Sequence, residues 1–159
     1  MIESRQTLRA IKPVVPFFER TKRNGFTFGV GPAGYDCRIH QDVVLAPGDF
    51  KLVSTDEEFC MPDNMLGVVH DKSTWARLGL AAQNTVIEPG WRGFLTLELT
   101  NHNRPRPWLK FWGKDNVLRI KAGTPIVQVI FHLLDKATDA PYAGKYQDQK
   151  SGAQMALFD

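Results

Sequence analysis

The stretch FLTLELT, residues 94–100, carries a leucine at every second position. Successive side chains of a β-strand point to opposite faces, so this spacing predicts a strand with one leucine face made by Leu95, Leu97 and Leu99. Glu98 then points to the other face. Alternation alone leaves two interpretations of this carboxylate, a charge in solvent or a member of a functional site.

A second stretch, PIVQVIF at residues 125–131, is apolar almost without interruption. Such a run predicts a strand that is covered on both faces. Gln128 is the polar residue within it. We expect its amide to form hydrogen bonds in the core, because buried polar groups in proteins are nearly always paired.

Glycine and proline interrupt the sequence between these runs and others like them. Short strand-like runs separated by turn residues are typical of all-β sandwiches and barrels, so we predict an all-β fold. The interrupting segments are GPAG (31–34), APGD (46–49), MPDN (61–64), EPGWRG (88–93) and KAGTP (121–125).

One short helix is expected near the start of the chain. Ser4 is a suitable N-cap, and Leu8 and Ile11 fall on one face of the helix. Pro13 should end it, because proline lacks the amide hydrogen and clashes with the preceding turn.

The 159 residues are 43% hydrophobic, enough to bury roughly two-thirds of the unfolded surface in one core. We expect a single domain over residues 1–159. The first residues lack the apolar core of a secretion signal, and no stretch approaches the roughly 18 apolar residues of a membrane span. We therefore expect a cytoplasmic protein without a membrane partner.

Cys37 and Cys60 belong to no C-x-x-C or C-x-x-H pair, so free thiols are favoured over a disulfide or a zinc site. The formal net charge is +3, from 20 basic and 17 acidic residues. This mild excess suits a small phosphorylated ligand as well as a nucleic acid.

Residues 103–119, NRPRPWLKFWGKDNVLR, mix basic and aromatic side chains. Such a mixture can stack on and neutralise single-stranded nucleic acid. We favour a long hairpin whose aromatic residues pack on the body or on a neighbouring subunit, because the stretch contains no recognisable nucleic-acid module.

Several catalytic classes are excluded because their motifs are absent. The sequence contains no G-x-x-x-x-G-K-[ST], G-x-S-x-G or H-E-x-x-H. Zinc-dependent nucleobase deaminases need an H-x-E and a P-C-x-x-C segment, and neither is present. Any deamination by this chain therefore has to proceed without zinc.

The block of residues 71–101, DKSTWARLGLAAQNTVIEPGWRGFLTLELTN, resembles the core of the dCTP deaminase family. In that family G-[RK]-[ST]-[ST]-x-x-R-x-G-[LI] precedes I-D-P-G-[WF]-x-G and then x-L-E. The matching residues are Lys72, Ser73, Thr74, Arg77, Gly79, Leu80, Ile87, Pro89, Gly90, Trp91, Gly93, Leu97 and Glu98. Downstream, Tyr142, Lys145, Tyr146 and Gln149 resemble the family's Y…KY…Q tail.

The resemblance implies a distorted β-sandwich or jelly-roll-like subunit of the dUTPase type, with a short N-terminal helix. It also implies a homotrimer with active sites shared between chains, and a flexible C-terminal flap over each site at about residues 141–159. The implied activity is hydrolytic deamination of dCTP to dUTP and ammonia in deoxynucleotide metabolism. Mg²⁺ would accompany the triphosphate, held mainly by phosphate oxygens.

By the same resemblance, Glu98 is the catalytic carboxylate. Deamination at C4 of cytosine needs a base for water, a proton for N3 and another for the departing ammonia, and one carboxylate can serve all three. Ser73 and Arg77 are expected to position the water and stabilise the tetrahedral adduct. The implied substrate-binding residues are Lys72, Thr74, Glu88, Trp91, Thr96, Leu97, Tyr142, Lys145 and Gln149.

Two alternatives stay open. QNTVIEPGWRG (residues 83–93) also fits the related trimeric dUTPases, although Glu98 favours a deaminase because dUTPases have an apolar residue there. A dUTPase, or a bifunctional enzyme that continues to dUMP, would use Glu88, which replaces the family's usual aspartate. The other alternative is a non-catalytic nucleotide-binding regulatory protein that uses residues 103–119 as its interaction surface.

Overall fold

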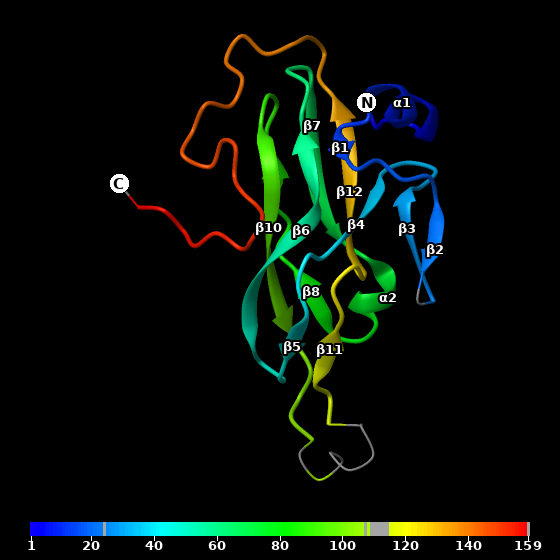
Figure 1. Cartoon of the computed structure of the whole chain (residues 1–159), viewed down its shortest axis with the longest axis vertical. Helices are drawn as coiled ribbons and strands as arrows, with labels where there is room; N and C mark the ends of the chain where they lie inside the picture. Colours follow the sequence, from blue (N-terminus) through cyan, green and yellow to red (C-terminus); the bar gives the residue numbers. More distant parts are fainter. Residues whose placement is uncertain (24, 107, 109–114, 159) are drawn as a thin grey trace.

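Short strands joined by glycine and proline turns make up most of the chain (Figure 1). The computed structural model describes residues 1–23, 25–106, 108 and 115–158. Two helices are assigned within these residues, α1 (Arg5–Ile11) and α2 (Ser73–Ala76). The strands in chain order are β1 (Val14–Val15), β2 (Thr21–Arg23), β3 (Phe26–Val30), β4 (Tyr35–Arg38), β5 (Val43–Leu45), β6 (Phe50–Cys60), β7 (Met65–Asp71), β8 (Leu80–Ala82), β9 (Val86–Ile87), β10 (Arg92–Asn101), β11 (Leu118–Ile120) and β12 (Pro125–Leu133).

The described strands form two larger sheets and a separate pair. The first sheet has the order β1-β6-β10-β8, and the second has the order β2-β3-β4-β12-β7-β9. β5 pairs with β11. All of these pairings are antiparallel. In Figure 1, β10 and β6 run to the left of β7 and β12.

Side chains from both sheets meet in one buried cluster. Val53 and Leu97 reach it from the first sheet, and Val69, Val127 and Phe131 reach it from the second; each is at most 1% exposed. Burial of one large aliphatic or aromatic side chain contributes about 1.5–3 kcal/mol, so this shared layer holds the sheets together. The predicted all-β fold is confirmed, as two packed sheets.

The short helix is confirmed at α1, with two differences from the expectation. Ser4 occupies the N-cap position, but its hydroxyl lies 3.3 Å from the Thr7 hydroxyl and does not cap a backbone amide. Leu8 is fully buried, whereas Ile11 is 38% exposed. The helix ends at Ile11, because Lys12 takes the left-handed conformation with φ 51°.

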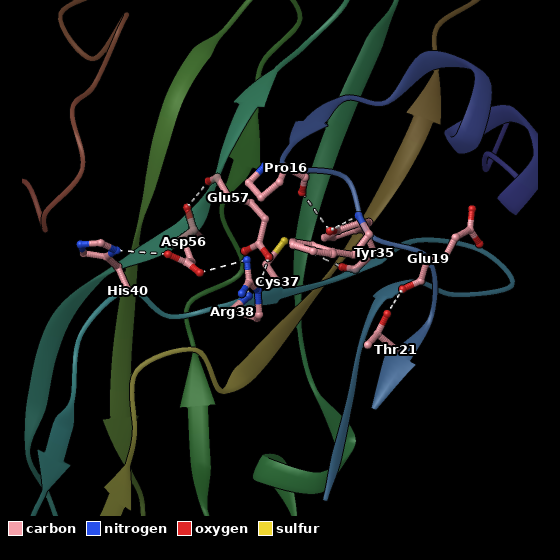
Figure 2. A network of polar contacts seen from close by, with 11 residues as sticks. Pro16, Glu19, Thr21, Tyr35, Cys37, Arg38, His40, Asp56 and Glu57 are labelled. Atoms are coloured by element: carbon pink, nitrogen blue, oxygen red, sulfur yellow. Dashed lines mark hydrogen bonds and ion pairs between the residues drawn. The ribbon is translucent and has the colours of Figure 1, made fainter. Parts of the chain in front are cut away.

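A buried ion-pair network joins β4 to β6 (Figure 2). Arg38 contacts Glu57 through Nε at 2.8 Å and Asp56 through Nη2 at 2.9 Å. Burial raises the pKa of the Glu57 carboxyl, and the Arg38 guanidinium opposes the rise. On the same side, the Tyr35 hydroxyl accepts the backbone N–H of Phe18 at 3.0 Å. The network therefore also holds the segment that precedes β2.

Three further expectations concern the periphery. Cys37 and Cys60 are both free thiols, as predicted. Among the described residues, no helix has the length and apolar character needed to cross a membrane. Much of the predicted hairpin at 103–119, including Phe111 and Trp112, lies outside the described residues, while Trp108 is 69% exposed.

Candidate active site

Strand β10 brings Glu98 to a cavity of about 490 Å³, hereafter the first cavity. Its walls come from β6, β9, β10 and the segment after β12. The apolar residues include Phe50, Leu52, Val86 and Leu95, and the polar ones include Thr85, Glu88, Thr96, Glu98 and Gln149. A largely apolar cavity with a few polar groups is the usual form of a small-molecule site.

An irregularity in the pairing of β10 with β6, where β6 has the extra residues, shapes this part of the sheet. The register against β6 shifts between Phe94 and Thr96, and the Leu95 N–H donates to the Thr55 hydroxyl at 2.9 Å. Leu97 is fully buried as predicted, but the prediction of a continuous leucine face was wrong at Leu95, which is half-buried and lines the cavity. Bulges re-aim side chains in this way and are frequent beside active sites.

The Glu98 carboxyl lies in the first cavity with one oxygen unpaired. Its backbone is fixed, because Glu98 stands opposite Leu52 and its carbonyl accepts the Gln83 N–H at 3.0 Å. Oε2 is buried and has no hydrogen-bond partner among the described residues. Removal from water raises the pKa of this carboxyl. Such a group is suited to exchange protons with a ligand or with a bound water.

Thr85 places a second unpaired polar atom beside the same cavity. Its Oγ1 is buried without a partner in the part of the chain that the structure describes. Buried polar atoms are nearly always paired, so two such atoms beside one cavity indicate that a polar ligand completes them. The sequence analysis missed Thr85, which stands between the two motif segments and has no spacing that marks it.

The segment after β12, drawn from orange to red in Figure 1, returns to β10 and forms one wall of the first cavity. The Phe94 N–H donates to the Gln149 carbonyl at 2.9 Å, and the Gln149 amide donates to the Thr96 hydroxyl at 2.5 Å. The Trp91 indole donates to the Tyr146 carbonyl at 2.8 Å. Three residues of the EPGWRG–FLT region thus hold the tail.

Two glycines of EPGWRG permit this close approach. A Cβ at Gly93, where φ is +144°, would lie 2.7 Å from the backbone nitrogen of Gln149. A Cβ at Gly90, where φ is +79°, would lie 2.6 Å from the Cβ of Pro141. A larger residue at either position would therefore displace the tail.

A second cavity, of about 370 Å³, lies beside the second sheet and is lined by Lys72 and Ser73 among others. The Lys72 ammonium contacts Asp36 at 2.5 Å. Burial raises the pKa of Asp36, while hydrogen bonds from Lys72 and Gln128 oppose the rise. The predicted hydrogen bonding of Gln128 is confirmed, but its place in the core was wrong, because the half-buried side chain lines this cavity.

The residues predicted for the site divide between the two cavities. Glu98, Glu88, Trp91, Thr96, Tyr142 and Gln149 line the first, and Lys72 and Ser73 line the second. Thr74, Arg77 and Lys145 are exposed and belong to neither lining, and Leu97 is fully buried in the core. One chain therefore does not group Glu98 with Ser73 and Arg77.

The described residues contain no group of three or more His, Cys, Asp or Glu side chains that could hold a metal ion. A divalent cation bound mainly by the phosphate oxygens of a ligand would need no such group, because Mg²⁺ commonly binds through one or two carboxylates, waters and substrate phosphates.

Comparison with known proteins links these features to one family. Residues 36–134 match the family model described as dCTP deaminase-like. The chain is similar to the dCTP deaminase of Campylobacter concisus, with 31% identity over 87% of each chain. It is 38% identical to that of Herpetosiphon aurantiacus over 76% of this chain and 64% of the relative.

Solved structures give the same fold. The dCTP deaminase of Agrobacterium tumefaciens superposes with a TM-score of 0.63 at 16% identity, over 83% of this chain and 48% of that one. The EIAV dUTPase superposes with a TM-score of 0.54 at 22% identity, over 79% of this chain and 91% of that one. The family match over residues 36–134, together with the relative that is 31% identical over 87% of each chain, shows that the chain belongs to the dCTP deaminase-like family.

Proposed function

We propose that this protein deaminates dCTP to dUTP and ammonia without zinc, with Glu98 as the group that moves the protons. The observation that carries the proposal is the half-buried Glu98 side chain, which lines a ligand-sized cavity with its buried Oε2 unpaired among the described residues. Membership of the dCTP deaminase-like family supports the same reaction.

The chemistry follows from the environment of Glu98. The carboxylate takes a proton from water, and the resulting hydroxide attacks C4 of the cytosine. Glu98 gives that proton to N3, then takes the second proton from the new C4 hydroxyl and delivers it to the amino group, so that the C4–N4 bond breaks and ammonia leaves. Burial raises the pKa of Glu98, which brings it closer to neutral pH and helps one group both accept and donate.

The cavity suggests how the nucleotide lies. The base would contact Glu98 and the unpaired Thr85 hydroxyl, and the sugar would lie near Trp91 and Glu88. Tyr142, Lys145 and Gln149 would hold the phosphate chain, with Mg²⁺ bound mainly by phosphate oxygens. A solved phage phi11 dUTPase of the same fold coordinates a structural Mg(II) ion.

The second cavity and the helix α2 beside it supply the remaining residues if the protein is a homotrimer. Ser73 and Arg77 would then reach the Glu98 of a neighbouring chain, position the water and stabilise the tetrahedral adduct. Lys72 and Thr74 would face the phosphates of the same nucleotide. This arrangement is supported by the separation of the predicted residues between two cavities of one chain. We expect the trimer to act in the cytoplasm.

The proposal is tested by Glu98→Gln in the full-length protein. Glutamine keeps the size and hydrogen bonding of the side chain but accepts no proton at neutral pH, so dCTP binding should survive. Ammonia release should fall by about 10²–10⁴-fold, the usual contribution of general acid–base catalysis. Release near the parent rate would contradict the assignment of Glu98.

Glu88→Gln is the matched variant, because Glu88 lines the same cavity and would serve a dUTPase. We expect it to keep ammonia release, with dUTP as the product. Pyrophosphate formed in step with ammonia by the parent, and lost in Glu88→Gln, would instead show a bifunctional enzyme. A parent protein that binds dCTP but releases neither product would show a regulatory binder.

A further inference from the structure

The second cavity contains a cation with no role in the mechanism above. Arg20 and Lys72 are the two cationic side chains among the described residues that line it. Lys72 contacts Asp36 at 2.5 Å and its side chain is 12% exposed. Its charge is therefore already balanced by a neighbouring carboxylate, which limits what it can offer to an anionic ligand.

Arg20 is exposed and has no hydrogen bond or ion pair with any described residue, and its charge acts on Asp36 only through space. The acidic residue next to it in sequence is already engaged, because Arg9 binds both carboxylate oxygens of Glu19 at 2.8 and 2.7 Å. The guanidinium of Arg20 keeps its donors for a ligand. The planar guanidinium can donate two parallel hydrogen bonds to two oxygens of one phosphate, whereas an ammonium group cannot make this bidentate contact.

The backbone on both sides of Arg20 is held in place. The Phe18 carbonyl accepts the Val30 N–H at 3.0 Å. The Thr21 hydroxyl donates to the Glu19 carbonyl at 2.7 Å, as Figure 2 shows. A Cβ at Gly29 would lie 2.5 Å from the Glu19 carbonyl oxygen, so the segment rests directly on β3. A free guanidinium on a fixed backbone is partly preorganised for binding, which lowers the entropy lost when a ligand is bound.

We propose that Arg20 binds the polyphosphate chain of the nucleotide and makes the bidentate contact that Lys72 cannot make while it is paired with Asp36. This inference rests on the proposed function, in which the Lys72–Ser73 region faces the phosphates of a nucleotide bound to a neighbouring chain. The ligand class is a nucleoside triphosphate.

The test uses the full-length protein with inorganic tripolyphosphate and Mg²⁺ as the probe, followed by isothermal titration calorimetry. Arg20→Gln should weaken tripolyphosphate binding by about 10- to 100-fold, the range for one hydrogen-bonded charged contact. The KM for dCTP should rise by a similar factor while kcat stays near the parent value. The tripolyphosphate affinity of Arg20→Lys should fall between those of the parent and Arg20→Gln, because lysine keeps the positive charge but cannot make the bidentate contact.

Lys22→Gln is the matched control, because Lys22 is an exposed cation on β2 that lies outside the cavity lining. It should change the binding constant by at most about twofold, as surface substitutions usually do. Thermal unfolding of Arg20→Gln should stay close to that of the parent, since the variant loses no hydrogen bond or ion pair with a described residue.

The outcomes separate this inference from the proposed function. Tripolyphosphate binding by Arg20→Gln at the parent affinity, an equal loss in Lys22→Gln, or no binding by the parent would each overturn the role of Arg20. If the parent binds the probe through Arg20 but releases no ammonia from dCTP, the proposed deamination fails and the anion site stands. If it deaminates dCTP and Arg20→Gln has the parent KM, the inference alone fails.

Discussion

At the residue scale, removal of Glu98 from water raises the pKa of its carboxyl, and this shift should be visible in catalysis. The first proton transfer needs the ionised form, so kcat/KM for dCTP should rise with pH as Glu98 loses its proton. We expect the midpoint of that rise above about 4.3, the ordinary glutamate pKa. A pH profile of ammonia release measures it, and a midpoint at or below the ordinary value would contradict a buried base.

The residual activity of Glu98→Gln provides the control, because the rise with pH should be missing from the pH profile of this variant.

The raised pKa of Glu98 also determines how this carboxyl affects the stability of the fold. A carboxyl whose folded pKa is raised favours the folded state below its unfolded pKa, and that contribution is lost as pH rises through the folded pKa. Glu98→Gln cannot ionise, so at neutral pH it should unfold at the parent temperature or above.

At the scale of elements, Gly93 is the point where the tail meets β10. In Gly93→Ala the new methyl would lie 2.7 and 2.8 Å from the Gln149 backbone nitrogen and oxygen, so the tail has to move. The Gln149–Thr96 hydrogen bond should then be lost, and the KM for dCTP should rise by about tenfold, equivalent to about 1.4 kcal/mol. Faster proteolysis within residues 142–158 would report the displaced tail directly.

Gly48→Ala controls for backbone strain in that experiment. Gly48 also has a positive φ, +86°, but a Cβ there has no atom within 4 Å. It should cost about 1–3 kcal/mol of stability from its backbone conformation and leave the KM unchanged. Equal effects of the two variants on the KM would show that tail displacement is not the cause.

The elements themselves were largely predictable, because local periodicity decides them. PIVQVIF forms most of β12, and α1 begins at the residue after Ser4. The errors came from events that periodicity does not encode. A bulge moved Leu95 to the cavity face, and the left-handed turn at Lys12 ended α1 with Ile11 exposed.

The candidate site was predictable where a motif marked it and not elsewhere. Glu98, Trp91 and Gln149, which the motifs marked, line the first cavity, and their roles toward a substrate stay predictions. Thr85 became visible only through its burial, and Leu52 only through its pairing with β10 opposite Glu98. Neither residue could be found from the sequence, because each reaches the cavity through the folding of its segment and belongs to no motif that marks it.

At the scale of the whole molecule, the separation of Glu98 from Ser73 has a direct consequence. The two side chains line different cavities of one chain, although both are expected to act on one substrate. Cyclic oligomers place different surfaces of adjacent subunits in contact, so a ring of three chains can join the first cavity of one subunit to the Lys72–Ser73 region of the next.

Mixed trimers test this arrangement. Glu98→Gln and Ser73→Ala should each be inactive as homotrimers, and neither change should prevent folding because Ser73 is exposed and glutamine matches glutamate in size. Suppose that each site takes Glu98 from one chain and Ser73 from the next. When equal amounts of the two variants exchange subunits at random, each contributing chain carries the needed native residue about half of the time. About a quarter of the sites in a cyclic assembly therefore contain both native residues. Ammonia release should therefore recover to about a quarter of the parent rate after mixing.

The two variants carried separately through the same exchange set the baseline. A mixture that stays at that baseline, although mass measurements show mixed trimers, would mean that each site is built within a single chain.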